Sequence, residues 1–315
     1  MRILNKQKKN MILVFFTEFI RLRCVMFWSA VSFGGFILGI SCLDLSNYII
    51  PLLVFLVSTF FIMSFTFAIN NYYDADSDSD NPRRMHINAI ASGIISKRNG
   101  ILLNFAFVII PLVVTFLFKI EVFLFCAFFL FWMWIYSSPP LRLKGRPGVD
   151  VIWHFFAFFF MVIWGSLIAG SINLINWLTA ISLGVWSSVC QVDNHIRDYS
   201  FDKDSGTNTY AVWIGIDKAK TTISILTLIH LILLIPLILL YSLSYYITII
   251  IIIVIPFIGL LILKPKKDAY PTKNCFIYFF TFVIGGAVYF SCLVYHILLI
   301  LGEPSLNLLN LNNLL

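Results

Sequence analysis

Long apolar runs limit the folds open to this chain more than any other feature of its sequence. A helix needs about 20 apolar residues to cross the hydrocarbon core of a bilayer, and we identify about nine runs of that length. They cover residues 24–43, 50–70, 100–118, 121–138, 151–171, 175–194, 219–241, 243–263 and 275–300. The runs lack the alternation that is typical of transmembrane β-strands. The pattern predicts an all-α integral membrane protein with about nine transmembrane helices.

Charged residues are too scarce to cover a water-soluble protein of this length. Of the 315 residues, 12% are charged and 60% are hydrophobic, and the mean hydropathy is +0.93. Soluble domains carry about 25% charged residues. We therefore exclude a water-soluble fold and expect the chain to lie in the lipid bilayer.

The basic residues are placed unevenly along the chain, and their placement predicts its orientation. Of the 22 Lys and Arg residues, all except Lys119 lie before the first run, after the second, fourth, sixth and eighth runs, or at the start of the seventh. Because positive loops stay in the cytoplasm, we expect the N-terminus and these loops on the cytoplasmic side of the cell membrane. The C-terminus is then expected on the outer side. The net charge of +7 then reflects topology rather than nucleic-acid binding.

The runs divide the chain into one long domain with two short ends. We expect a cytoplasmic basic segment over 1–23, a single transmembrane domain over 24–300 and a short extracytoplasmic tail over 301–315. Within the basic segment, residues 11–22 fit either an amphipathic helix on the inner leaflet or a simple anchor for the first span.

Acidic side chains gather in two short segments, each at the end of an apolar run. Asn70, Asp74 and Asp78 recur every four residues in the first segment, and Asp198 and Asp202 keep that spacing in the second. On a helix, residues spaced in this way line one face. Because ionisable residues at membrane depth are costly and usually functional, we interpret both segments as parts of a site.

The two acidic segments also correspond in position. Asp74 and Asp198 lie 124 residues apart, and so do Asp78 and Asp202. This offset spans four runs and predicts two similar four-helix halves plus one further helix, arranged around a central cavity. Repeats of this kind often place a site at their interface.

The spacing of the acids indicates the metal that they would bind. Stacked carboxylates repel one another unless cations lie between them, and oxygen ligands at a helix end suit Mg²⁺, which takes one or two carboxylates plus substrate phosphates. For Asp76, Asp80 and Asp204 we favour solvated positions without a function.

Basic residues in the cytoplasmic loops lie close in sequence to the acids: Arg83, Arg84, Arg142, Lys144, Arg197 and Lys203. A diphosphate leaving group needs fixed positive charge as well as metal, but the positive-inside rule alone also explains such cations. The segment from Tyr136 to Lys144 is more specific. Its two prolines break the helix and bring a tyrosine and two cations to the membrane edge.

Together these motifs resemble those of the UbiA superfamily of intramembrane prenyltransferases over almost the whole chain. The first family motif, Asn-Asp-x-x-Asp-x-x-x-Asp, is matched at Asn70, Asp74 and Asp78, with Asn71 in place of the usual Asp. Residues 88–93, Asn-Ala-Ile-Ala-Ser-Gly, resemble the family's Arg-Pro-x-x-Ser-Gly stretch.

The second family motif is centred on Asp-x-x-x-Asp and is matched at Asp198 and Asp202. The family's Tyr-x-x-x-Lys motif is not kept, because a proline stands four residues after Tyr136. Arg142 and Lys144 can substitute for it. In this loop the chain most resembles the lycopene-elongase branch and the archaeal digeranylgeranylglyceryl phosphate synthase branch of the superfamily.

The resemblance implies a role for each matching residue. Metal binding falls to Asn70, Asp74, Asp78, Asp198 and Asp202. Catalysis falls to Asp74, Asp198, Tyr136, Arg142 and Lys144. Binding of the substrate diphosphate falls to Arg83, Arg84, Lys144, Arg197 and Lys203.

The activity implied by the resemblance is the Mg²⁺-dependent transfer of a prenyl group from a prenyl diphosphate to a lipophilic acceptor in the membrane, through an allylic carbocation. The identity of the acceptor stays open. A terpene cyclase of the same superfamily is an alternative, in which the cation attacks an alkene of its own chain. A polytopic transporter is a second alternative, but transporters usually hold their polar residues near the bilayer midplane, whereas these acids lie at the ends of runs.

Overall fold

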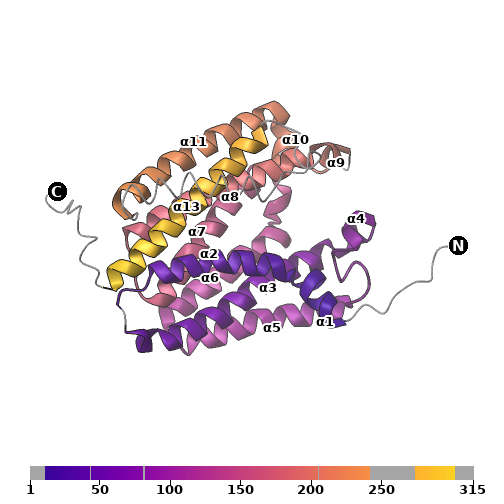
Figure 1. Ribbon diagram of the computed structural model, residues 1–315. Helices are drawn as coiled ribbons and strands as arrows, with labels where there is room; N and C mark the ends of the chain where they lie inside the picture. Colours follow the sequence, from indigo (N-terminus) through magenta and orange to yellow (C-terminus); the bar gives the residue numbers. More distant parts are fainter. Residues whose placement is uncertain (1–10, 43, 81, 205, 242–273, 302–315) are drawn as a thin grey trace. The chain divides into compact units, whose positions relative to one another are not determined.

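The computed structural model describes most of the chain, namely residues 11–42, 44–80, 82–204, 206–241 and 274–301. In these residues the regular structure is entirely helical, without a β-strand (Figure 1). The predicted eighth run, 243–263, lies outside the described residues, as does nearly all of the predicted tail. The all-α expectation is confirmed.

Eight long helices account for the predicted runs within the described residues. They are α2 (Leu22–Leu38), α3 (Ile49–Ser79), α5 (Lys97–Phe116), α6 (Ile120–Ser137), α7 (Val149–Ala169), α8 (Leu174–Arg197), α11 (Ile216–Tyr241) and α13 (Asn274–Ile300). The short elements are α1 (Met11–Val14), the π-helix η1 (Phe15–Phe19), the 3₁₀-helices η2 (Leu45–Tyr48) and η3 (Leu143–Gly145), α4 (Pro82–Met85), α9 (Tyr199–Asp204) and α10 (Tyr210–Ile214). The largest departures from the predicted boundaries are at the C-terminal ends of α2, which stops five residues early, and α3, which continues nine residues further.

Five helical stretches are long and apolar enough to cross a membrane: 46–79, 97–116, 120–137, 149–169 and 216–240. The apolar helices Leu22–Leu38 and Ile284–Ile300 are shorter. Helix α8 has the length of a span but carries polar side chains along much of it, several of them buried. Buried polar groups on a spanning helix need partners inside the protein, so α8 is a helix that packs against protein.

The helices fall into two compact units. Unit 1 comprises Met1–Phe33 and Asn47–Asp150, and unit 2 comprises Gly34–Ser46 and Val151–Leu315. The boundary after Asp150 lies between the fourth and fifth predicted runs, where the sequence predicts that one half ends. The predicted central cavity stays a prediction.

Unit 1 is built around α3, which packs against α5 and α6. The segment before α2 also belongs to its core. Phe19 and Ile20 are fully buried, and the rings of Phe15 and Phe19 lie 6.4 and 6.3 Å from that of Phe107 on α5. Residues 14–20 are therefore packed into unit 1 rather than lying apart from it.

In unit 2, α8 packs against α11, and α11 packs against α13. A polar cluster joins the three helices, because the Ser182 hydroxyl lies 3.2 Å from His230 Nδ1 and 2.8 Å from the Tyr289 hydroxyl. The C-terminal part of α2 approaches α7 closely at Gly35, where a Cβ atom would lie 2.1 Å from the Val162 carbonyl oxygen. Only glycine permits this contact.

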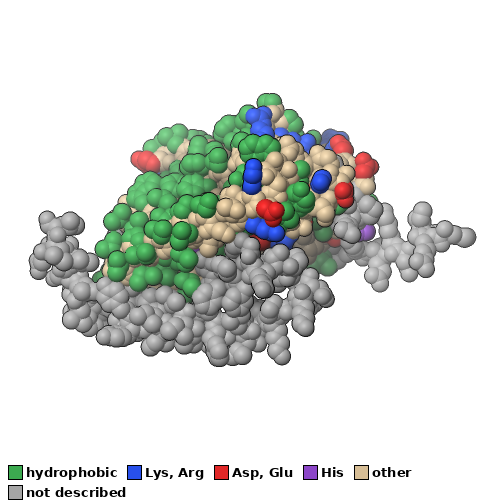
Figure 2. Space-filling view, turned by 90° about the horizontal axis from the view of Figure 1, so that it is seen from above, with side chains coloured by type: hydrophobic (Ala, Val, Ile, Leu, Met, Phe, Trp, Pro, Cys, Tyr) green, Lys and Arg blue, Asp and Glu red, His purple; other side chains and the backbone are tan. Residues whose placement is uncertain are grey.

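Large apolar side chains lie exposed at helical spacing on the outer helices. On α5 they are Leu102, Phe105, Ile109, Val113 and Phe116. Figure 2 shows a broad hydrophobic area on one face of the molecule, away from most of the charged side chains visible there. Hydrocarbon solvates such a surface, and water does not.

Candidate active site

The first acidic motif lies on α3 itself. This helix has 31 residues, so at about 1.5 Å per residue it is about 46 Å long, which exceeds the hydrocarbon core of about 30 Å. Its final turns therefore extend past the apolar layer and carry Asn70, Asp74 and Asp78. The helical spacing predicted for these three residues is confirmed.

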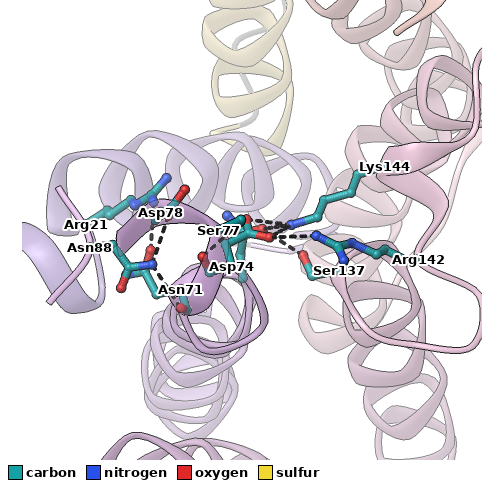
Figure 3. Close-up of polar contacts among 10 residues, drawn as sticks. Arg21, Asn71, Asp74, Ser77, Asp78, Asn88, Ser137, Arg142 and Lys144 are labelled. Atoms are coloured by element: carbon teal, nitrogen blue, oxygen red, sulfur yellow. Dashed lines mark hydrogen bonds and ion pairs between the residues drawn. The ribbon is translucent and has the colours of Figure 1, made fainter. Parts of the chain in front are cut away.

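Asp74 and Asn70 hold a single cation between them. The Lys144 ammonium donates to both carboxylate oxygens of Asp74 at 2.5 Å and to Asn70 Oδ1 at 2.7 Å (Figure 3). Asn70 Oδ1 also accepts from the Ser137 hydroxyl at 2.9 Å. The side chains of Asp74 and Lys144 are only 15% and 16% exposed, so water screens their ion pair weakly.

The loop after α6 supplies a second cation to Asp74. Arg142 Nη2 donates to Asp74 Oδ1 at 3.2 Å, and the Arg142 side chain is about half exposed. Arg142 has φ = 38°, in the left-handed region that non-glycine residues seldom adopt. This turn leads into η3 and presents both Arg142 and Lys144 to the end of α3, as Figure 3 shows. The prediction that these cations lie beside the acids is confirmed within unit 1.

Two opposing effects act on the Lys144 ammonium. Burial lowers the pKa of Lys144 because it removes water from the charged form, while the adjacent Asp74 carboxylate raises it. The net pKa shift is downward. The ammonium is thus held in place by Asp74 in surroundings that disfavour an isolated charge.

Asp78 accepts a hydrogen bond from a neutral side chain. It is 5% exposed, and its Oδ2 accepts from Asn88 Nδ2 at 2.9 Å. Asn88 is fully buried and begins the stretch 88–93 that resembles a family motif. Gly93 ends that stretch with φ = 72°, which suits glycine. The residues of this stretch therefore form a turn that contacts the acidic end of α3.

Arg21 is a contact of the site that sequence reasoning missed, because nothing distinguished it from the other basic residues before the first run. Its Nη2 donates to Asn71 Oδ1 at 2.7 Å. Burial is the main cause that lowers the pKa of Arg21, and the nearby Asp78 and Asp74 carboxylates oppose it. An arginine expected in a basic cytoplasmic segment thus lies in the polar network of α3.

The remaining acids of the first segment lie away from this network. Asp76 forms an exposed ion pair with Lys97 at 2.7 Å, with side chains 87% and 50% exposed. Asp80 follows the last residue of α3 and is exposed. Both positions agree with the solvated role expected for them.

The second acidic segment lies where α8 ends. Asp198 is exposed and terminates α8, and the chain restarts as α9 at Tyr199. The spacing survives the break, because the Asp202 amide still donates to the Asp198 carbonyl at 2.8 Å. Asp202 is 4% exposed. The two carboxylates therefore keep their four-residue spacing but differ greatly in exposure.

The other basic residues predicted to bind diphosphate lie in three places. Arg197 pairs with Asp193 at 2.5 Å on the same helix. Lys203 is exposed on α9, and Arg84 is exposed on α4, which also contains Arg83. Tyr136 lies near the C-terminal end of α6 and is half-buried. The structure gives no test of their roles.

The sequence profile of the UbiA prenyltransferase family matches residues 28–284. The chain belongs to the UbiA prenyltransferase family. The matched region contains both acidic segments and the loop with Arg142 and Lys144, so the motif resemblance is confirmed, and the chain is an integral membrane protein.

Two kinds of UbiA relative share about half of the chain. A digeranylgeranylglyceryl phosphate synthase from Korarchaeum cryptofilum is 33% identical over 175 residues, which are 53% of this chain and 57% of that protein. A lycopene elongase/hydratase from Corynebacterium glutamicum is 26% identical over 172 residues, 50% of this chain and 56% of that protein. The chain thus spans little more than half the length of these relatives. They represent the two branches that the loop after Tyr136 resembles.

Solved UbiA structures cover nearly the whole fold. A UbiA homologue from Archaeoglobus fulgidus, solved with GPP and Mg²⁺ bound, is 25% identical, with a TM-score of 0.62 over 89% of this chain and 98% of that one. A digeranylgeranylglyceryl phosphate synthase structure has a TM-score of 0.67 at 18% identity, over 90% of this chain and 98% of that one. The fold is therefore the UbiA fold.

The oxygen donors of α3 are suited to the Mg²⁺ that this family implies. The described residues contain no group of three or more His, Cys, Asp and Glu side chains placed to hold a metal. Mg²⁺ needs fewer, because it takes one or two carboxylates and completes its shell with water and phosphate oxygens. Asn70 and Asp74 already direct their oxygens at one cation, the Lys144 ammonium. The donor set fits a magnesium ion shared with a phosphorylated substrate.

Proposed function

We propose that this UbiA-family protein transfers a prenyl group from a prenyl diphosphate to a lipophilic acceptor within the membrane, with Mg²⁺ as cofactor. The observation that carries the proposal is the convergence of Asn70 and Asp74 oxygens on one cation, beside Arg142. The A. fulgidus homologue with GPP and Mg²⁺ bound supports this choice of substrate and metal.

The acids divide between two helix ends. Asn70, Asp74 and Asp78 would hold Mg²⁺ in unit 1, and Asp198 and Asp202 would do so in unit 2. The bound metal neutralises the diphosphate and makes it a better leaving group. Asp74 and Asp198 are the acids on which the reaction depends most.

The cations bind the diphosphate directly. Lys144 and Arg142, which pair with Asp74, would donate N–H groups to phosphate oxygens when that carboxylate is a metal ligand. Charge-assisted hydrogen bonds of this kind strengthen as negative charge develops on a leaving group. Tyr136 contributes to the same reaction, and Arg83, Arg84, Arg197 and Lys203 supply further positive charge.

The reaction breaks the bond between the allylic carbon and the diphosphate oxygen. The electron pair leaves with the diphosphate, and the remaining allylic cation is attacked by the acceptor, which then loses a proton. The excess of basic residues beside the acids supports a cytoplasmic position for these helix ends and the N-terminus. The prenyl chain lies in the apolar part of the protein or bilayer.

A terpene cyclase is the second candidate, since the cation can react with an alkene of its own chain. The relatives favour transfer, because one is named for the synthesis of digeranylgeranylglyceryl phosphate and the other for the elongation of lycopene. A transporter is disfavoured by the family match and by the position of the acids at helix ends.

The test is to supply purified protein in lipid with labelled geranylgeranyl or farnesyl diphosphate, with Mg²⁺ or with EDTA, and with a membrane lipid extract as the source of acceptor. We expect Mg²⁺-dependent diphosphate release and label in a larger lipid. Label in a released hydrocarbon indicates the cyclase, and no diphosphate release under any condition contradicts the proposal.

A further inference from the structure

The segment before α2 has an unusual backbone where it meets α3. Residues Phe15–Phe19 form a π-helix, in which the Ile20 amide donates to the Phe15 carbonyl five residues earlier, at 3.0 Å. Arg21 follows with φ = 54°, in the left-handed region. Short π-helical turns often occur at functional sites, and left-handed non-glycine residues persist only where their surroundings hold them.

Asn71 on α3 is the residue that meets this turn. Its Nδ2 donates to the carbonyl oxygens of Glu18 at 2.7 Å and Phe19 at 2.8 Å, and its Oδ1 accepts from Arg21 Nη2 at 2.7 Å. Both N–H groups of the amide are used, and the side chain is fully buried. An aspartate at this position would have no N–H to donate, and its oxygens would face two carbonyl oxygens.

Asn88 connects Asn71 to Asp78. Its Oδ1 accepts from the amides of Ile90 at 3.0 Å and Ala91 at 3.2 Å, which fixes the orientation of its own side-chain amide. Its Nδ2 then donates to the Asn71 carbonyl and to Asp78 Oδ2, both at 2.9 Å. Every hydrogen-bonding group of this buried side-chain amide has a partner, so the amide is fixed in one orientation. The Asp78 carboxylate that it contacts is thereby restricted in its own orientation.

Two of the departures from the family motifs, at Asn71 and at Asn88, therefore meet in one network. Asn71 stands where the family usually has Asp, and Asn88 stands where the related stretch begins with Arg. Arg21 brings a positive charge to this network. Figure 3 shows Arg21, Asn71, Asn88 and Asp78 together, on the opposite side of Asp74 from Lys144 and Arg142.

We propose that Arg21, Asn71 and Asn88 form a brace that positions the Asp78 carboxylate and fastens residues 15–21 to α3. Asn71 is then a positioning residue and not a metal ligand, although it occupies the place of an acid in the motif. The part of the inference that concerns Asp78 rests on the proposed function, while the attachment of residues 15–21 does not.

The first arm of the test measures the attachment by hydrogen exchange of the full-length protein in lipid nanodiscs. Asn71→Asp restores the usual family residue but removes both N–H donors. We expect exchange in residues 15–21 to become at least about tenfold faster, because two hydrogen bonds are lost. The matched control is Asn176→Asp in unit 2, a fully buried asparagine whose Nδ2 donates to Ser166 Oγ at 2.7 Å. Unchanged protection of residues 15–21 in Asn71→Asp overturns the brace.

The second arm measures metal binding without turnover, by the electron paramagnetic resonance signal of Mn²⁺ in the presence of inorganic diphosphate. Asn88→Ala removes the partner of Asp78, and loss of such an outer partner weakens metal binding by about 10- to 100-fold. A merely structural role would lower the melting temperature and leave the Mn²⁺ affinity unchanged, as we expect for Asn176→Ala. Wild-type Mn²⁺ affinity in a folded Asn88→Ala protein overturns the positioning of Asp78.

The two arms separate failure of the brace from failure of the proposed function. If the wild-type protein binds no Mn²⁺ with diphosphate, the proposed function and the role assigned to Asp78 are both wrong, and the exchange arm still decides the attachment. Suppose instead that the wild type binds Mn²⁺, that Asn71→Asp binds it with the same affinity, and that residues 15–21 of this variant keep wild-type protection from exchange. The brace alone is then wrong.

Discussion

The two acidic helix ends share a spacing but differ in their local chemistry. At the end of α3, Asp74 is mostly buried and pairs with Lys144 and Arg142 from a loop about 70 residues later. At the end of α8, Asp198 is exposed at a break in the helix, and the ion pair of that region, between Arg197 and Asp193, lies within one helix.

The difference shows what a four-residue repeat does and does not determine. The repeat places carboxylates on one side of a helix end. It does not determine the partner side chains, and these decide how firmly each carboxylate is held in place. In unit 1 the cations are held before any substrate arrives. We expect unit 1 to contribute more to fixing the metal and unit 2 to be more easily rearranged.

The largest effect should come from removing the best-held acid. Asp74→Ala takes away the carboxylate on which both cations converge, and we expect turnover to fall about 1,000-fold or more. The matched control is Asp76→Ala, two residues away on α3 and exposed, which should stay within about twofold of wild type because surface pairs contribute little. Diphosphate release measures both. Equal losses in the two variants would mean that net acidity, and not the geometry of Asp74, matters.

A smaller effect should follow from removing the positive charge of Lys144. Lys144→Met keeps the length of the side chain and removes the donor expected to stabilise the leaving diphosphate, so turnover should fall about 100-fold. Lys97→Met, which breaks the exposed pair with Asp76, is the control and should change little. Steady-state rates at saturating Mg²⁺ measure the effect. A normal rate in Lys144→Met would restrict Lys144 to a structural partner of Asp74.

The smallest effect should come from the corresponding change in unit 2. Arg197 is about half exposed and pairs within its own helix, so Arg197→Met should raise the KM for the prenyl diphosphate by about tenfold or less, as rim charges do. If Arg197→Met lowered turnover as much as Lys144→Met is expected to, the two helix ends would not differ in the way described above.

The sequence predicted the helices and the acids well because both depend on local pattern. Each apolar run within the described residues forms a helix over most of its length, and the four-residue spacing placed Asn70, Asp74 and Asp78 on one helix. The proline-containing loop also suggested correctly that Arg142 and Lys144 belong beside them, since family resemblance carried that information across the intervening chain.

The sequence did not predict the contacts of Arg21, Asn71 and Asn88. Asn71 and Arg21 are 50 residues apart and meet only because the turn before α2 packs on α3. The π-helix that exposes two carbonyl oxygens to Asn71 has no signature in composition or periodicity. The boundary of α3 was also placed too early, because polar residues after position 70 hid the continuation of the helix.

The central claim, that Asp74 and Asp198 are both needed to bind a prenyl diphosphate with Mg²⁺, is tested most directly by calorimetric titration of a non-reactive prenyl diphosphate analogue with Mg²⁺. Wild-type protein should bind one analogue per chain, and Asp74→Ala and Asp198→Ala should each weaken that binding by at least about tenfold. Wild-type affinity in either variant would show that its acid takes no part in binding the diphosphate, and the account would be contradicted.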